Sequence, residues 1–172
     1  GSSIYLTAKK PKADGGNPAI AADMNHAAYP SGPAGKFNLL GSHDTPRVLS
    51  VVGGNEALAR LGAVLLFTFP GVPSVYYGDE IGLAGGRDPD NRGCMPWDRA
   101  QWNEEMRAWY QRLIHLRRTA PALVEGGFQV LHATGETIAF QREAPDDRII
   151  VVARRAPDGL IGLAARAAGL VD

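Results

Sequence analysis

Two apolar runs, each followed by a helical pattern, place the strongest constraint on how this chain can fold. The first run is Phe37–Leu40, and the helical pattern Glu56–Phe67 follows it. The second run is Pro73–Tyr77, rich in β-branched and aromatic residues, and the helical pattern Glu104–Arg118 comes after it. This alternation predicts two β/α units with parallel strands. Because two parallel strands cannot cover both faces and both edges of a sheet, we expect the units to belong to a larger β/α assembly.

The chain has a different pattern on each side of these units. Pro and Gly interrupt every candidate element in residues 1–36, so this segment is predicted to be irregular. After Pro121 the apolar period changes to two, which is typical of half-buried strands. The sequence thus predicts an irregular Gly/Pro-rich segment at 1–36, the β/α units at 37–120 and a small, truncated β domain at 121–172.

We expect about three antiparallel strands in the C-terminal β domain. They are predicted at Gly127–Ala133, Thr137–Arg142 and Ile149–Arg155, where apolar and polar residues alternate. The segment 159–172 is rich in Ala, Gly and Leu and has no clear period. No helix or strand is therefore predicted in that segment.

The charge and the cysteine content exclude several classes of protein. The 18 basic and 18 acidic residues balance and form no basic cluster, unlike the surface of a nucleic-acid-binding protein. Cys94 is the single cysteine, so neither an internal disulfide nor a thiolate metal site is expected. No apolar run approaches the ~18 residues of a membrane helix, and the first residues lack a secretory signal pattern. We therefore expect a cytoplasmic protein without membrane or nucleic-acid partners.

Polar residues follow both predicted strands of the β/α units. His43 and Asp44 come after the first strand, and Asp79 and Glu80 come after the second. A long loop with further charged residues then occupies 82–102, and loops of this length are usually functional. In (β/α)8 barrels the active-site groups lie on the loops that follow the C-terminal ends of the strands. The sequence therefore predicts a site at this edge of the parallel sheet.

Three stretches resemble motifs of the α-amylase superfamily of glycoside hydrolases. Asn38–Arg47 is similar to its seventh-strand motif, and Phe69–Glu80 is similar to its eighth strand. Gly85–Arg92, followed by Met95-Pro96-Trp97, resembles the loop after that strand. The residues of these three stretches are most similar to those of the neopullulanase, cyclomaltodextrinase and maltogenic amylase group. The resemblance covers 37–120 and implies the last two β/α units of a TIM (β/α)8 barrel, followed by a small antiparallel β module.

The resemblance implies a role for four residues. Asp44 matches the third catalytic carboxylate, which stabilises the transition state through hydrogen bonds to sugar hydroxyls. His43 matches a residue that binds the same glucose, whereas Asp88 and Arg92 match a pair that binds the next glucose. The implied activity is retaining hydrolysis or transglycosylation at α-glucosidic bonds of maltodextrins or cyclodextrins. The implied partner is an α-glucan oligosaccharide, and neither a cofactor nor a metal is expected.

The sequence departs from the family pattern in one important respect. Retaining glycosidases use a nucleophilic carboxylate and a separate acid about 5 Å apart, and the family places both in motifs that should precede Phe37. Residues 1–36 contain nothing similar. Two alternatives to an active enzyme therefore stay open. The chain is either a non-catalytic fragment or pseudo-enzyme with a partial sugar-binding surface, or a structural module that self-associates through its exposed parallel strands.

The same residues also have simpler interpretations. His43 and Asp44 could form an ordinary turn or a metal pair, but no second His lies at ligand spacing. The loop that begins at Asp88 mimics part of a calcium loop, but Arg92 and Arg99 occupy positions that need oxygen ligands. For Asp79 and Glu80 we favour a role in ordering the loop. Trp97 and Trp102 could stack on sugars, whereas core packing is the better interpretation for Trp109. Tyr76 and Tyr77 are expected to point to opposite sides of a strand.

Because the nucleophile and the acid are missing, we predict that the isolated chain does not hydrolyse maltoheptaose or β-cyclodextrin. Loss of either group disables the two-step retaining route. The measurement is reducing-sugar release by the purified chain, with Asp44→Ala as the control for contaminating enzymes. Turnover that survives purification and disappears in the Asp44→Ala protein would contradict the prediction.

Overall fold

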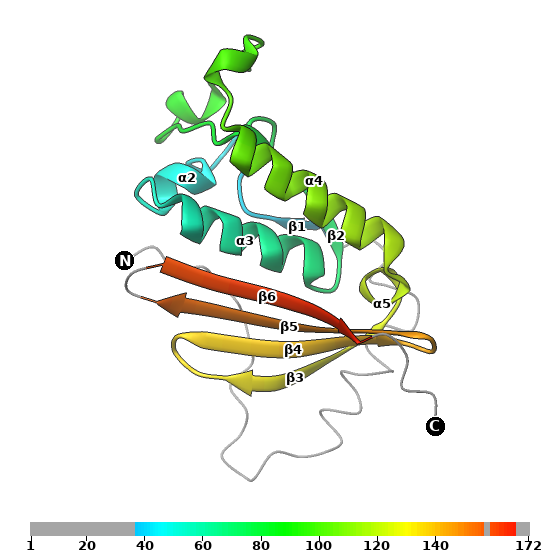
Figure 1. Cartoon of the computed structure of the whole chain (residues 1–172). Coiled ribbons are helices and arrows are strands. Elements are labelled where there is room, and N and C mark those ends of the chain that lie inside the picture. The colour runs from blue at the N-terminus through cyan, green and yellow to red at the C-terminus, as the bar shows by residue number, and fades with distance from the viewer. Residues whose placement is uncertain (1–36, 157–158, 168–172) are drawn as a thin grey trace.

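A computed structural model describes residues 37–156 and 159–167 of the chain. The predicted irregular segment 1–36 lies outside the described residues. Figure 1 shows one long helix along a four-stranded sheet, a second long helix on the far side of the first, and a short pair of strands behind the helices. Within the described part of the chain, no helix is long and apolar enough to span a bilayer.

The two predicted parallel strands are present and lie side by side. Strand β1 (Phe37–Leu39) pairs with β2 (Val72–Ser74) in parallel register, with Phe37 opposite Val72. Between them come the short helix α2 (Val48–Val51) and the longer helix α3 (Glu56–Thr68). After β2 the chain forms the long predicted loop and then helix α4 (Glu104–Thr119). The predicted order of strand, helix, strand and helix is confirmed.

Side-chain caps account for where the two long helices begin. Asn55 Oδ1 accepts a hydrogen bond from the amide of Leu58 (3.1 Å) at the start of α3. Asn103 Oδ1 accepts one from the amide of Met106 (2.9 Å) at the start of α4. In both cases the Asn side chain satisfies an amide that has no partner in the first turn, and acidic residues follow it. Local chemistry thus fixes both starts.

The C-terminal sheet has one strand more than the sequence predicts. Its strands run in the order β3-β4-β5-β6, all antiparallel, and α5 (Pro121–Val124) precedes them. Strands β3 to β6 span, in this order, Gly127–Ala133, Thr137–Ala144, Asp147–Ala156 and Gly159–Ala167. The fourth strand was not predicted because Ala and Gly have low strand propensity and give no alternating pattern. Its pairing with β5, from Arg148 opposite Ala167 to Ala156 opposite Gly159, holds it in the sheet.

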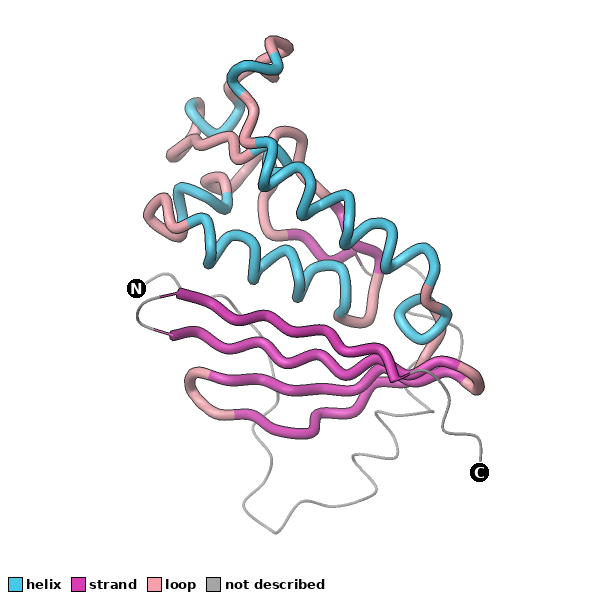
Figure 2. The backbone as a smooth tube through the Cα atoms, viewed as in Figure 1, coloured by secondary structure: helices cyan, strands magenta, loops and turns pink. Residues whose placement is uncertain are grey.

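One apolar core joins the helices to this sheet. It contains Ala63 and Phe67 from α3, Tyr110 from α4, and Phe140 and Val151 from the sheet. Figure 2 shows α3 lying along the sheet and α4 on the far side of α3. The core is continuous across residue 120, so the β/α units and the sheet stabilise each other.

Two arginines connect the C-terminal end of α3 to α4 and to the sheet. Arg142 on β4 is buried and donates to the carbonyls of Thr68 (3.0 Å), Gly126 (2.9 Å) and Gly127 (3.1 Å). Burial, together with the charge of Arg117, lowers the pKa of Arg142 to about 10. Arg117 on α4 donates to further carbonyls at the same end of α3. Carbonyls at a helix C-terminus lack partners within the helix and carry partial negative charge, so they suit guanidinium donors.

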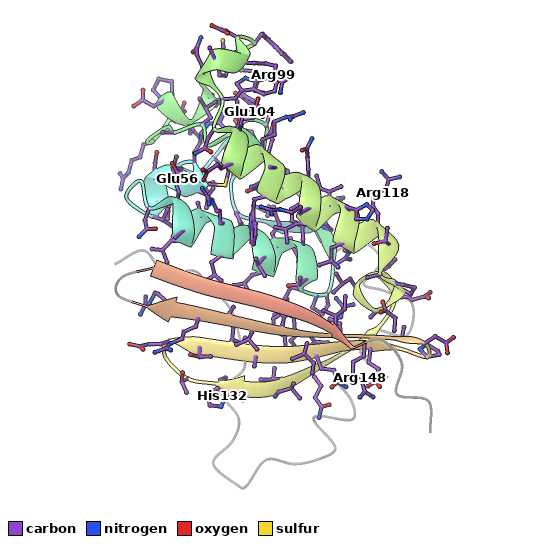
Figure 3. The ribbon with its side chains drawn as sticks, in the orientation of Figure 1. Glu56, Arg99, Glu104, Arg118, His132 and Arg148 are labelled. Atoms are coloured by element: carbon purple, nitrogen blue, oxygen red, sulfur yellow. The ribbon has the colours of Figure 1, made fainter. Side chains whose placement is uncertain are left out.

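We predict that Arg142→Met lowers the free energy of unfolding by about 3 kcal/mol or more, because three buried carbonyls lose their donor. The matched control is Arg148→Met. Arg148 lies on the side of the sheet away from the helices and pairs with exposed Glu143, so its loss should cost about 1 kcal/mol or less. Figure 3 labels Arg148. Urea denaturation measures both values. Equal losses of unfolding free energy in the two variants would show that the Arg142 contacts do not hold α3 against the antiparallel sheet.

Candidate functional site

The turn after β1 presents His43 and Asp44 to solvent. Ser42 and Thr45 close this turn: the Asp44 amide donates to Ser42 Oγ (3.2 Å), and the Ser42 amide donates to Thr45 Oγ1 (3.1 Å). Nε2 of His43 lies 3.3 Å from Oδ2 of Asp44, and the two side chains are 69% and 79% exposed. A small set of local hydrogen bonds therefore orders the backbone and leaves both functional groups open to a ligand.

The loop after β2 carries Asp88 and Arg92, the second predicted pair. The short helical turn η3 (Asp90–Arg92) brings the two side chains together in an ion pair between Nη2 of Arg92 and Oδ1 of Asp88. The hydrogen bond from Arg92 to Asp88 and the charge of Asp88 raise the pKa of the Arg92 guanidinium. Asn91, which directly precedes Arg92, donates hydrogen bonds to the carbonyls on both sides of Asp44, so the two predicted pairs lie close together.

Several hydrogen bonds attach this loop to the chain that follows β1. Asn91 donates from Nδ2 to the carbonyls of His43 (2.7 Å) and Thr45 (3.1 Å). The Arg47 amide donates to the Gly85 carbonyl (3.0 Å), and the Gly85 amide donates to Ser50 Oγ (2.9 Å). Figure 2 shows the loop, interrupted by short helical turns, extending past the N-terminal end of α4. The loop is long, but these contacts give it a defined position beside the turn at residues 42–45.

Arg47 is the buried centre of this region. Its side chain is fully buried, and the guanidinium carbon lies 4.6 Å from the ring centroid of Tyr76 and 4.6 Å from that of Tyr77. Nη1 donates to the Tyr77 carbonyl and lies 3.4 Å from Oδ1 of Asp79. Cation–π attraction and an ion pair thus connect the chain after β1 to the chain after β2.

The prediction that Tyr76 and Tyr77 point to opposite sides of a strand is wrong. Strand β2 ends at Ser74, two residues before Tyr76, so the alternation of side chains along a strand does not apply. The rings of Tyr76 and Tyr77 instead contact each other, with centroids 4.7 Å apart, and both contact Arg47. The Tyr77 hydroxyl also donates to the Gly93 carbonyl (2.9 Å), which attaches the far end of the loop.

Asp79 orders the structure rather than facing a ligand, as we favoured from the sequence. It is buried, and a side chain at position 41 would place its Cβ 2.6 Å from Oδ2 of Asp79, so Gly41 permits the close approach. Burial raises the pKa of Asp79 to about 6, although the nearby Arg47 guanidinium acts in the opposite direction. The neighbouring Glu80 adds a smaller upward shift to that pKa.

The three tryptophans differ in how they are held. Trp109 is half-buried against the core and donates from Nε1 to the Arg60 carbonyl (3.1 Å), in agreement with a packing role. Trp102 donates to the Pro96 carbonyl (2.6 Å) and orders the end of the loop. Trp97 is 81% exposed. The loop ends where Arg99 and Glu104, both labelled in Figure 3, form an ion pair at 2.8 Å.

The exposed polar side chains on this surface offer hydrogen-bonding groups to a ligand. Among residues 37–156 and 159–167, no group of three or more His, Cys, Asp or Glu side chains could hold a metal ion. Exposed carboxylates, an imidazole and a guanidinium offer paired acceptors and donors for vicinal hydroxyls. No role in building this surface is predicted from the sequence for Arg47 or Asn91. Arg47 and Asn91 lie inside stretches that resemble family motifs, which was the one available signal.

Comparison with known proteins identifies the class to which this fold and surface belong. Residues 22–112, more than half of the chain, match the family described as "Alpha amylase, catalytic domain". The chain therefore belongs to the α-amylase family. The match includes both strands of the parallel pair, the loop at 82–102 and the first half of α4.

Individual relatives agree with this family and with the group expected from the sequence. A cyclomaltodextrinase of Thermoanaerobacter pseudethanolicus is 46% identical over 116 residues, which is 67% of this chain and 20% of the relative. Neopullulanase 2 of Thermoactinomyces vulgaris is 42% identical over 127 residues, 72% of this chain and 22% of the relative. The chain thus spans about a fifth of the length of these relatives.

Solved structures share the fold as well as the sequence. The ligand-free cyclic α-maltosyl-(1→6)-maltose hydrolase of Arthrobacter globiformis superposes with a TM-score of 0.70 at 36% identity. That superposition covers 77% of this chain and 35% of the hydrolase. A debranching enzyme of Nostoc punctiforme gives a TM-score of 0.64 at 46% identity over 68% of this chain and 24% of the enzyme.

The raised pKa of Asp79 predicts how stability depends on pH. Because the folded state binds this proton more tightly than the unfolded state, protonation favours folding. The contribution of Asp79 to stability is therefore greatest below its ordinary pKa of 3.8 and is lost as pH rises through about 6. A shift of this size corresponds to a change on the order of 3 kcal/mol.

The test compares Asp79→Asn with the wild type at pH 4 and pH 7.5 by urea denaturation. We expect the stability advantage of the wild type over Asp79→Asn to shrink by roughly 2.5 kcal/mol between these two pH values, because the contribution is nearly complete at pH 4 and lost at pH 7.5. Asp146→Asn is the control, because Asp146 is exposed in the turn between β4 and β5. A constant difference between wild type and Asp79→Asn at both pH values would contradict the assignment.

Proposed function

We propose that this chain supplies one side of the active site of a retaining α-glucan glycosidase. In this proposal Asp44 stabilises the transition state, and His43 binds the same glucose. Asp88 and Arg92 bind the adjacent glucose. The observation that carries the proposal is that Asn91 bonds the loop bearing Arg92 to the turn bearing Asp44. These segments follow two neighbouring parallel strands, and the Asp44 and Arg92 side chains are exposed. Active sites of (β/α)8 barrels are built at this edge of the sheet.

We further propose that the parallel pair is formed by the last two strands of such a barrel. Among the described residues, β1 and β2 pair with each other alone. Three apolar side chains on them are largely exposed: Phe37 at 67%, Leu39 at 53% and Val72 at 47%. Exposed apolar side chains on a parallel pair are what further β/α units would cover. The antiparallel sheet is then the module that follows the barrel.

The proposed substrates are maltodextrins or cyclodextrins. Relatives named cyclomaltodextrinase and neopullulanase support this class of substrate. The Arthrobacter hydrolase has been solved with cyclic α-maltosyl-(1→6)-maltose and with maltose, and the Nostoc enzyme after soaking in acarbose. A cytoplasmic location is also proposed, supported by an intracellular maltogenic amylase of Bacillus subtilis that is 38% identical over 118 residues, 67% of this chain and 20% of the relative.

In this proposal Asp44 stabilises the transition state and is neither the nucleophile nor the acid. As the sugar ring flattens toward an oxocarbenium ion, its hydroxyls become more acidic and their hydrogen bonds to a carboxylate strengthen, by several kcal/mol in total. Arg92 and Asp88 contact a glucose that does not react, so they hold it equally well before and during the reaction. Asp79 does not serve as nucleophile or acid in this proposal, because it is buried against Arg47.

A second candidate function is a partial sugar-binding surface without catalysis. The observation that favours it is the sequence of residues 1–36, in which nothing resembles the nucleophile or acid motifs. The exposed apolar side chains of β1 and β2 would then contact a second copy of the chain. Sedimentation measures this directly: association would agree with the second candidate, and a stable monomer would oppose the self-association part of it.

In an active protein that contains this chain, Asp44→Asn should lower kcat at least 100-fold and change KM little, because the lost interaction strengthens near the transition state. Arg92→Ala should instead raise KM for oligosaccharides and leave kcat nearly unchanged. Steady-state kinetics on maltoheptaose separates the two effects. Turnover by Asp44→Asn within about threefold of wild type, less than 1 kcal/mol in activation free energy, would contradict the role of Asp44.

A further inference from the structure

The Asn91 side chain lies between the two segments that carry the candidate sugar-binding residues. It is fully buried, although the neighbouring residues Asp90 and Arg92 are exposed. Its Nδ2 donates to the carbonyl of His43 at 2.7 Å and to the carbonyl of Thr45 at 3.1 Å. These two carbonyls flank Asp44 on either side. One side chain from the loop after β2 thus fixes the backbone on both sides of the carboxylate that follows β1.

The chemistry of these contacts determines the orientation of the amide. Both neighbours are carbonyl oxygens, which only accept hydrogen bonds, so the donating NH2 group must face them. Both hydrogens of Nδ2 are then used, one for each carbonyl. An oxygen at this position would face two carbonyl oxygens in a buried place, which is unfavourable. The position therefore requires a short side chain with a two-hydrogen donor.

The local turn alone does not fix Asp44 relative to Arg92. Its hydrogen bonds run within residues 42–45, so they order the turn but give it no fixed relation to the loop after β2. Asn91 spans 48 residues of sequence to His43 and 46 to Thr45. Because Arg92 follows Asn91 directly, the same backbone segment carries the guanidinium and holds the turn that carries the carboxylate.

We infer that Asn91 is a positioning residue: its side-chain amide sets where Asp44 stands relative to Arg92, and so relative to two consecutive sugars. The effect of Asn91 on ligand binding rests on the proposed function. The contact between Asn91 and the turn can be measured without any sugar. Asn91 itself does not touch the substrate and acts through Asp44.

The test variant is Asn91→Asp, which keeps the size and removes the donor. The matched control is Asn103→Asp. The Asn103 side chain accepts a hydrogen bond at the start of α4, and a carboxylate accepts equally well there. If Asn91→Asp does not fold, Asn91→Ala removes the donor without adding charge.

The first readout is the 13C chemical shift of the His43 and Thr45 carbonyls in the labelled full chain. We expect both carbonyl shifts to move in Asn91→Asp, because both oxygens lose their donor, and to stay unchanged in Asn103→Asp. The second readout is the affinity for acarbose by calorimetry. We expect Asn91→Asp to weaken binding at least tenfold and Asn103→Asp to change it less than twofold.

The readout that separates positioning from general stability is a double-mutant cycle with Asp44→Asn. If Asn91 acts through Asp44, Asn91→Asp should change acarbose affinity less than twofold once Asp44 is already Asn. Equal effects of Asn91→Asp in the two backgrounds, or unchanged carbonyl shifts, would overturn the inference. If the wild-type chain does not bind acarbose, the proposed function fails. The carbonyl shifts then decide alone whether Asn91 holds the turn.

Discussion

The rest of the candidate site depends on the contacts that the buried guanidinium of Arg47 makes. It lies between the rings of Tyr76 and Tyr77 and pairs with Asp79, so it joins the segment after β1 to the segment after β2. A buried charge is tolerated only where such partners compensate for lost hydration. Asp44 lies three residues before Arg47, so this anchor limits where the turn that carries Asp44 can lie, and Asn91 then holds that turn on both sides of Asp44.

Two further arginines support this anchor from the other end of the β/α units. Arg117 and Arg142 donate to carbonyls at the C-terminal end of α3, immediately before β2 begins. The antiparallel sheet is thus connected to the strand whose end carries the long loop. The shared core, with Phe140 of the sheet and Phe67 of α3, excludes water from these contacts and strengthens them. Packing far from the surface thereby determines the geometry of the polar residues on it.

The starts and ends of the two long helices were predicted well, because they depend on residues that are close in sequence. The Asn55 and Asn103 caps and the apolar periods placed α3 and α4 within a residue or two of their ends. Strand β6 was missed because its Ala and Gly residues have no period, and only pairing with β5 makes it a strand. The roles of Arg47 and Asn91 could not be predicted, because their partners lie 30 to 48 residues away in sequence. The family motifs identified the exposed groups but not the buried residues that position them.

The central claim is that one surface, formed by the turn at His43–Asp44 and the loop at Asp88–Arg92, binds consecutive glucose units. Amide chemical-shift mapping of the full chain with maltotriose tests this claim most directly. The account predicts that the largest shifts fall at residues 42–47 and 88–93 and that the strands β3 to β6 stay unchanged. Shifts confined to the sheet or to the exposed face of α4, with none at these two segments, would contradict it.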